Sequence, residues 1–69
     1  MKMLGYKLTR IQKSLQGFDY ESDALLIINF DTILWGTIFF EQDLRSNSLI
    51  PVRAEYEDPK TGVIKAVTL

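Results

Sequence analysis

The stretch that decides the fold is ALLIINFDTILWGTIFF, residues 24–40 of the 69-residue chain. Residues 24–28 form a continuous apolar run, which is typical of a strand buried on both faces. Residues 29–32 tolerate a turn, and the apolar pattern then resumes over residues 33–40 as a second strand. One long bent strand with a bulge near Asp31 or Gly36 would use the same residues.

The strand expected at residues 33–40 carries apolar side chains on both faces. Strand alternation divides them into two sets, with Ile33, Trp35 and Phe39 on one face and Leu34, Ile38 and Phe40 on the other. A short helix covers only one of these faces. Either the sheet curls or loops cover the second face, or that face is a protein interface with aromatic anchors. The interface hypothesis rests on Trp35, Phe39, Ile33 and Phe30.

Two further strands are expected after a polar loop at residues 41–48. Over residues 50–57 apolar and mostly charged side chains alternate, which indicates a half-buried strand, and Pro51 suggests an edge position or the start of that strand. Residues 58–62, DPKTG, have the composition of a turn, because proline presets φ and glycine accepts a positive φ. We therefore expect a last strand over residues 63–68 that pairs with residues 50–57 in a hairpin.

The N-terminal segment has the periodicity of a helix. Leu4, Leu8, Ile11 and Leu15 follow the spacing of one helical face, and Gly17 is placed where a helix would end. Leu4, Tyr6 and Leu8 also alternate as in a strand, so a strand is the competing interpretation.

These elements predict one small domain over residues 1–69. The preferred fold class is α+β, with an amphipathic helix at residues 3–16 packed on a four-stranded, mainly antiparallel meander sheet. If the N-terminal segment is extended, the alternative is an all-β, five-stranded small barrel of the SH3-like or OB-like kind.

The composition limits both the chemistry and the means of stabilising so short a chain. With no cysteine and no histidine, the chain lacks disulfides, the usual zinc ligands, a thiolate nucleophile and an imidazole base. We therefore expect no enzymatic activity, no cofactor and no metal site. A chain of this length buries only about 60% of its unfolded surface, which favours self-association or an unusually apolar core.

The net charge of −1 hides an asymmetry between the two ends of the chain. Residues 1–17 contain Lys2, Lys7, Arg10 and Lys13 without an acidic residue, whereas all nine acidic residues lie in residues 18–69. A basic helical face using Lys7, Arg10 and Lys13 would suit nucleic acid, although a sequence pI of about 5.2 is low for that function.

Residues 24–40 also resemble a membrane segment in hydropathy, but Asn29, Asp31 and Thr32 interrupt them. We expect no membrane span and, without a recognisable signal peptide, a cytoplasmic location. The overall expectation is a non-catalytic protein–protein interaction module of the inhibitor, antitoxin-like or phage accessory type. Its partner would be another protein or a second copy in a homodimer, and a small nucleic-acid-binding module is the alternative.

Overall fold

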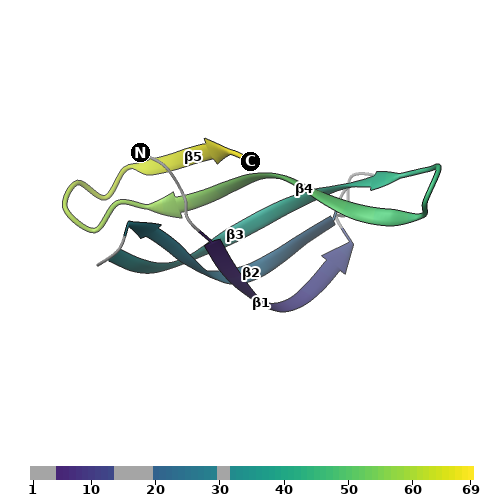
Figure 1. Ribbon diagram of the computed structural model, residues 1–69. Helices are drawn as coiled ribbons and strands as arrows, with labels where there is room; N and C mark the ends of the chain where they lie inside the picture. Colours follow the sequence, from purple (N-terminus) through teal and green to yellow (C-terminus); the bar gives the residue numbers. More distant parts are fainter. Residues whose placement is uncertain (1–4, 14–19, 30–31) are drawn as a thin grey trace.

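A computed structural model describes residues 5–13, 20–29 and 32–69, and these residues form one antiparallel sheet of five strands (Figure 1). The strands are β1 (Gly5–Lys13), β2 (Tyr20–Asn29), β3 (Thr32–Asp43), β4 (Ser48–Glu57) and β5 (Ile64–Thr68). Each strand pairs with the next along the chain, which gives a meander. None of the described segments is a helix that could cross a membrane.

The predicted N-terminal helix is wrong. Residues 5–13 are a strand, and they pair antiparallel with β2; residues 3–4 and 14–16 of the prediction lie outside the described residues. The five-stranded all-β alternative agrees with the structure. Within the described ranges β1 does not pair with β5, so the sheet is open rather than a closed barrel.

A β-bulge explains why this strand has the spacing of a helix. Leu8 pairs with Ala24 and Arg10 with Asp23, so β1 has one extra residue, Thr9, at this point. The extra residue places Leu8 and Ile11, three positions apart, on the same face of the sheet. The Thr9 hydroxyl donates a hydrogen bond of 2.8 Å to the Asp23 carbonyl and thus ties the bulge to β2.

Residues 24–40 form two strands, not one bent strand. The β2–β3 pairing runs from Tyr20 opposite Phe40 to Asn29 opposite Thr32, on either side of residues 30–31. The expectation that residues 24–28 are buried on both faces is wrong for one face, because Ile27 is 38% exposed. Pro51 lies beside a bulge in β4, opposite Phe40, in a part of β4 that β5 does not pair with.

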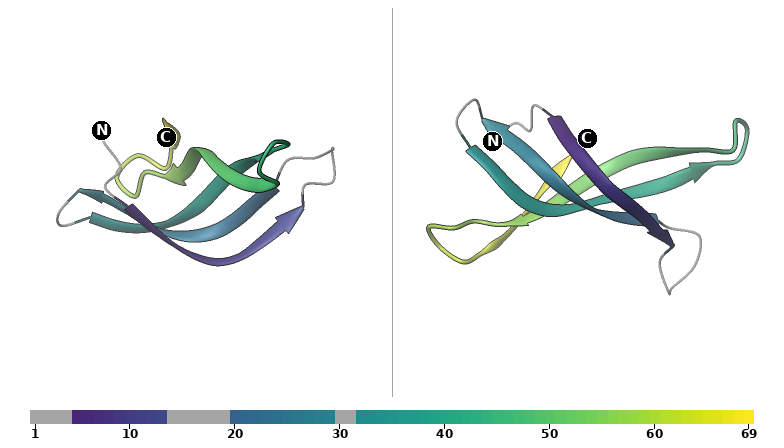
Figure 2. Two further views of the ribbon diagram at one scale, coloured as in Figure 1. Left: turned by 45° about the vertical axis from the view of Figure 1, so that its right-hand side comes forward. Right: turned by 90° about the horizontal axis from the view of Figure 1, so that it is seen from below.

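The core occupies one face of the sheet, which we call the inner face. The sheet is strongly twisted and coiled, and β4 and β5 cross the direction of β1 and β2 (Figure 2). Seven apolar side chains are buried on this face: Ala24, Leu26, Ile28, Ile38, Phe40, Ala54 and Tyr56. Five partly buried side chains pack against them: Leu8, Tyr20, Leu34, Leu49 and Val67. The opposite side is the outer face.

Gly36 occupies the tightest point of this core. A Cβ atom at this position would lie 2.4 Å from the Glu55 carbonyl oxygen and 2.5 Å from a terminal methyl carbon of Leu26. The missing side chain therefore lets β4 approach β3 closely and leaves space that Leu26 fills. Glycine within a strand commonly marks such a bend or close backbone approach.

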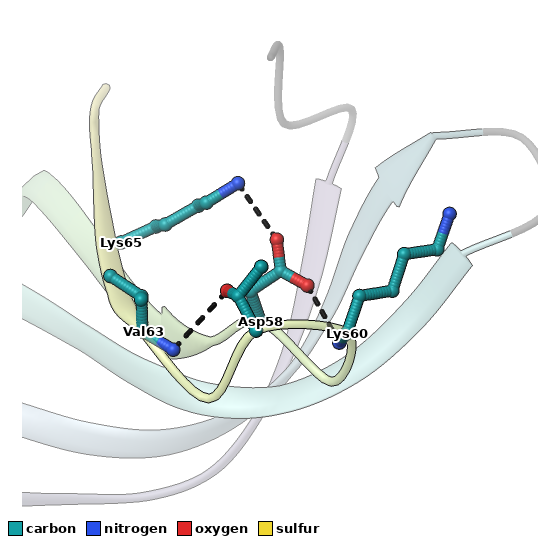
Figure 3. Close-up of polar contacts among 5 residues, drawn as sticks. Asp58, Lys60, Val63 and Lys65 are labelled. Carbon is teal, nitrogen blue, oxygen red and sulfur yellow. Dashed lines mark hydrogen bonds and ion pairs between the residues drawn. The ribbon is translucent and has the colours of Figure 1, made fainter.

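The β4–β5 turn follows its sequence signature. The Asp58 amide donates to the Val63 carbonyl at 2.9 Å, and Gly62, with φ of 71°, donates to the Asp58 carbonyl at 2.7 Å. The Asp58 carboxylate accepts from the Lys60 amide at 2.9 Å and forms a 2.7 Å ion pair with Lys65 of β5 (Figure 3). One carboxylate therefore links the turn to the last strand.

We predict that Gly36→Ala lowers the free energy of unfolding by about 1–3 kcal/mol, because the new methyl group overpacks the core against backbone. Gly5→Ala is the matched control, since its Cβ would meet only Ile27, at 3.9 Å. The control should stay within about 0.5 kcal/mol of the wild type. Urea unfolding followed by circular dichroism measures both, and equal effects would contradict the close approach at Gly36.

We predict that the Asp58–Lys65 ion pair makes stability depend on pH at the acid end. The hydrogen bond from Lys65 and its charge, together with the Lys60 amide, hold the pKa of Asp58 below its usual value. A lowered folded-state pKa stabilises the fold above the unfolded-state pKa of about 3.9, and this contribution disappears as pH falls through the folded-state value.

Asp58→Asn is the informative variant, because asparagine resembles the protonated acid and can still accept from the Lys60 amide. The urea midpoint of the variant should lie below that of the wild type at about pH 7 and converge with it at about pH 2. A midpoint difference of the same size at both pH values would show that the charge of Asp58 is not involved.

Candidate functional site

The outer face exposes a cluster of large apolar side chains at one end of the β2–β3 hairpin. Trp35 is 64% exposed, Ile33 57% and Ile27 38%, while Leu25 is half-buried. Leu25 lies directly opposite Trp35 and Ile27 directly opposite Ile33 in the strand register, so the four residues adjoin. We call these four residues the outer apolar patch.

The position of the patch follows from where β4 leaves β3. The β3–β4 pairing ends at Gly36 opposite Tyr56, and β4 then enters the turn toward β5. Residues 33–35 of β3 consequently pair with β2 on one side and with no described strand on the other. Ile33 and Trp35 therefore lie on the part of β3 that extends past its pairing with β4.

Phe39 shares the outer face but is in a different environment. It lies four residues along β3 from Trp35, with Thr37 between them, and it is only half exposed. The Arg53 guanidinium carbon lies 4.2 Å from the centre of its ring, and Arg53 also approaches the Glu55 carboxylate at 3.8 Å. Trp35 and Ile33 are thus the exposed members of the predicted set, while Phe30 lies outside the described residues.

The predicted basic residues lie on a strand and not on a helix. Lys7 and Arg10 are exposed on β1, in register with Leu25 and Asp23 of β2, so both belong to the outer face. Lys13 ends β1 opposite Tyr20. Acidic residues share this outer face: Glu21, Asp23, Glu41, Glu55 and Glu57.

The rows of residues across the outer face have a consistent order of charge. One row runs from Lys7 through Leu25 to Trp35, and Glu57 continues it on β4, one position beyond the pair of Gly36 with Tyr56. The next row runs from Arg10 through Asp23 and Thr37 to Glu55. Bases therefore flank the patch on the β1 side and acids on the β4 side.

The sequence pattern indicated half of this patch. Ile33 and Trp35 follow from alternation in β3, whereas Leu25 and Ile27 were expected to be buried. What identifies them is the observed register, in which a shift between Ile27 and Asn29 places residue 27 opposite 33 and residue 25 opposite 35. Unbroken pairing from Asn29 opposite Thr32 would instead place residue 27 opposite 34.

In the part of the chain that the structure describes, neither a hollow beside the β4–β5 turn nor the acidic side chains have the form of a typical ligand or metal site. A hollow of about 180 Å³ near Leu34, Tyr56, Asp58 and Lys60 is smaller than the roughly 300–1,000 Å³ of typical ligand pockets. In residues 5–13, 20–29 and 32–69 no group of three or more acidic side chains is arranged to hold a metal ion.

Comparison of the chain with protein-family models, curated proteins and solved structures gives no match in any of the three. The candidate function therefore rests on the residues of the outer face.

We predict that Trp35 contributes little to the stability of the isolated chain. At low micromolar concentration, Trp35→Ser should change the free energy of unfolding by at most about 1 kcal/mol, the scale of an exposed cross-strand pair. Leu26→Ala, at a fully buried position, should cost about 2–5 kcal/mol. Urea unfolding by circular dichroism compares them, and equal losses would identify Trp35 as a core residue.

Proposed function

We propose that this chain is a non-catalytic protein–protein interaction module that binds its partner through the outer apolar patch. The observation that supports it is the joint exposure of Trp35 and Ile33 on a regular, hydrogen-bonded part of the sheet. Clustered apolar surface of this kind favours association, and tryptophan is enriched among the residues that dominate binding energy. Chains of this size suit inhibitors, antitoxin-like partners and phage accessory proteins.

The charges beside the patch indicate the chemistry of the partner. Lys7 and Arg10 lie on one side of the apolar rows, and Glu55 and Glu57 on the other. A complementary protein surface would offer an apolar centre with acids facing β1 and bases facing β4. Such charges at the rim steer encounter and fix orientation, while the buried apolar centre supplies affinity.

A nucleic acid is the weaker candidate, although Lys7, Arg10 and Lys13 fall on one strand. On the outer face Lys7 and Arg10 are interleaved with Glu21 and Asp23 of the neighbouring strand. These carboxylates would repel a phosphate backbone, whose neutralisation by bases supplies most of the affinity in such complexes. The mixture of charges therefore favours a protein partner.

Photo-crosslinking tests the proposal. A photoreactive phenylalanine replaces Ile33, beside Trp35, in cells that produce the chain, and the matched control replaces Thr61 in the exposed β4–β5 turn. We expect a discrete adduct from position 33 only. The captured protein, or the chain itself, is then purified and titrated with wild type and with Trp35→Ala.

Trp35→Ala should raise the dissociation constant by about 30-fold or more, as at a binding hot spot, while the far-UV spectrum of the variant matches that of the wild type. Equal affinity of the folded variant, or identical adducts from positions 33 and 61, would contradict binding through the outer apolar patch.

A further inference from the structure

We infer that the partner of the outer face is a second copy of this chain, packed face to face about a two-fold axis that runs parallel to β2 and β3. This inference rests on the proposed function and specifies its partner. It is carried by the order of charged and apolar residues across the sheet, which is complementary to itself.

A two-fold axis along the strands reverses the order of strands across the interface. If the axis passes between β2 and β3, β1 of one subunit faces β4 of the other, and β2 faces β3. Lys7 then lies opposite Glu57 of the partner subunit, because Glu57, one position beyond the last β3–β4 pair, extends the row that contains Leu25 and Trp35. Arg10 likewise lies opposite Glu55 of the partner subunit. Both rows thus bring a base against an acid, and symmetry makes each contact twice.

The same two-fold rotation brings the apolar side chains of the two copies into contact. Leu25 pairs with Trp35 within one chain, so the axis between β2 and β3 brings Trp35 over Leu25 of the partner subunit, and Ile33 over Ile27 of the partner subunit. The more exposed side chain of each row, on β3, therefore meets the less exposed one, on β2. Four apolar side chains of each copy leave water together, which is the main driving force of association.

Lys7 cannot meet Glu57 of its own chain, and Arg10, which lies beside Asp23, cannot meet Glu55 of its own chain. Lys7 on β1 and Glu57 on β4 are separated by β2 and β3, hence by about 14 Å across the sheet. Lys7 forms no ion pair with any described residue. If a substitution at Lys7 changes the effect of a substitution at Glu57 on dimerisation, the two residues must therefore interact between two molecules.

Sedimentation equilibrium with charge-reversed variants tests the arrangement. We expect the wild type to pass from 8.0 kDa to twice that mass as concentration rises. Lys7→Glu and Glu57→Lys should each weaken the dimer by about tenfold or more, because each places like charges opposite one another at two symmetric sites. Arg45→Glu, in the exposed β3–β4 turn, has the same charge change as Lys7→Glu; it is the control for that variant and should dimerise like the wild type.

The decisive sample is an equimolar mixture of Lys7→Glu and Glu57→Lys. In a mixed dimer the first chain has acids at both positions and the second has bases at both, so both contacts become favourable again. The mixture should therefore dimerise nearly as tightly as the wild type. Far-UV spectra check folding, and Lys7→Gln with Glu57→Gln, which should each give a smaller loss, replace any reversed variant that does not fold.

Three results would overturn the inference: a wild type that stays at 8.0 kDa up to about 1 mM, single variants that dimerise like the wild type, or a mixture that fails to restore the dimer. A monomeric wild type together with Trp35-dependent binding of a different protein would remove the homodimer and leave the proposed function in place. A dimer insensitive to Trp35→Ala would instead contradict both.

Discussion

The close approach of β4 to Gly36 is the constraint on which the rest of the structure depends. Because no side chain occupies this position, the Glu55 carbonyl comes within 2.4 Å of where a Cβ would lie, and Leu26 fills the remaining space. The sheet can then bend around its own inner face and bury Ile38 and Tyr56 without a covering helix in the described part of the chain. Gly36 opposite Tyr56 is also the last pair between β3 and β4. Residues 33–35 of β3 therefore extend past the end of the β4 pairing.

Side chains along β3 alternate between the two faces of the sheet, so the strand contributes both to the core and to the outer apolar patch. Ile38 and Phe40 point to the inner face and are buried, whereas Ile33 and Trp35 point to the outer face and are exposed. Exposure of apolar surface to water is unfavourable by roughly 25 cal/mol of free energy for each Å². Folding of the single chain does not remove the apolar surface of the outer face from water. A chain with no disulfide or histidine can recover that free energy by association, which couples its stability to its partner.

The features that the sequence did not predict are those that depend on the pairing register between strands. Alternation predicted the two faces of residues 33–40 and the signature DPKTG predicted the β4–β5 turn, since both depend on local chemistry. The bulge at Thr9 depends on pairing with β2, and by inserting one residue it gave a strand the spacing of a helix. The continuous run at residues 24–28 likewise contains no alternation from which the exposure of Ile27 could be read. For the site, Ile33 and Trp35 were accessible from the sequence, but Leu25 and Ile27 required the register.

The edges of the sheet narrow the ways in which the chain can associate. An open sheet offers its outermost strands to further strands, and proteins prevent this with charged residues, short strands, bulges and proline. The outer strand β1 carries Lys7 and Arg10 and a bulge at Thr9; β5 is only five residues long; and the uncovered part of β4 contains Pro51 beside a second bulge. These three edges thus resist pairing with another strand, whereas residues 33–35 of β3, beyond the β3–β4 pairing, have none of these features. The proposed function places association instead at the outer apolar patch, where Trp35 and Ile33 are exposed without any such protection.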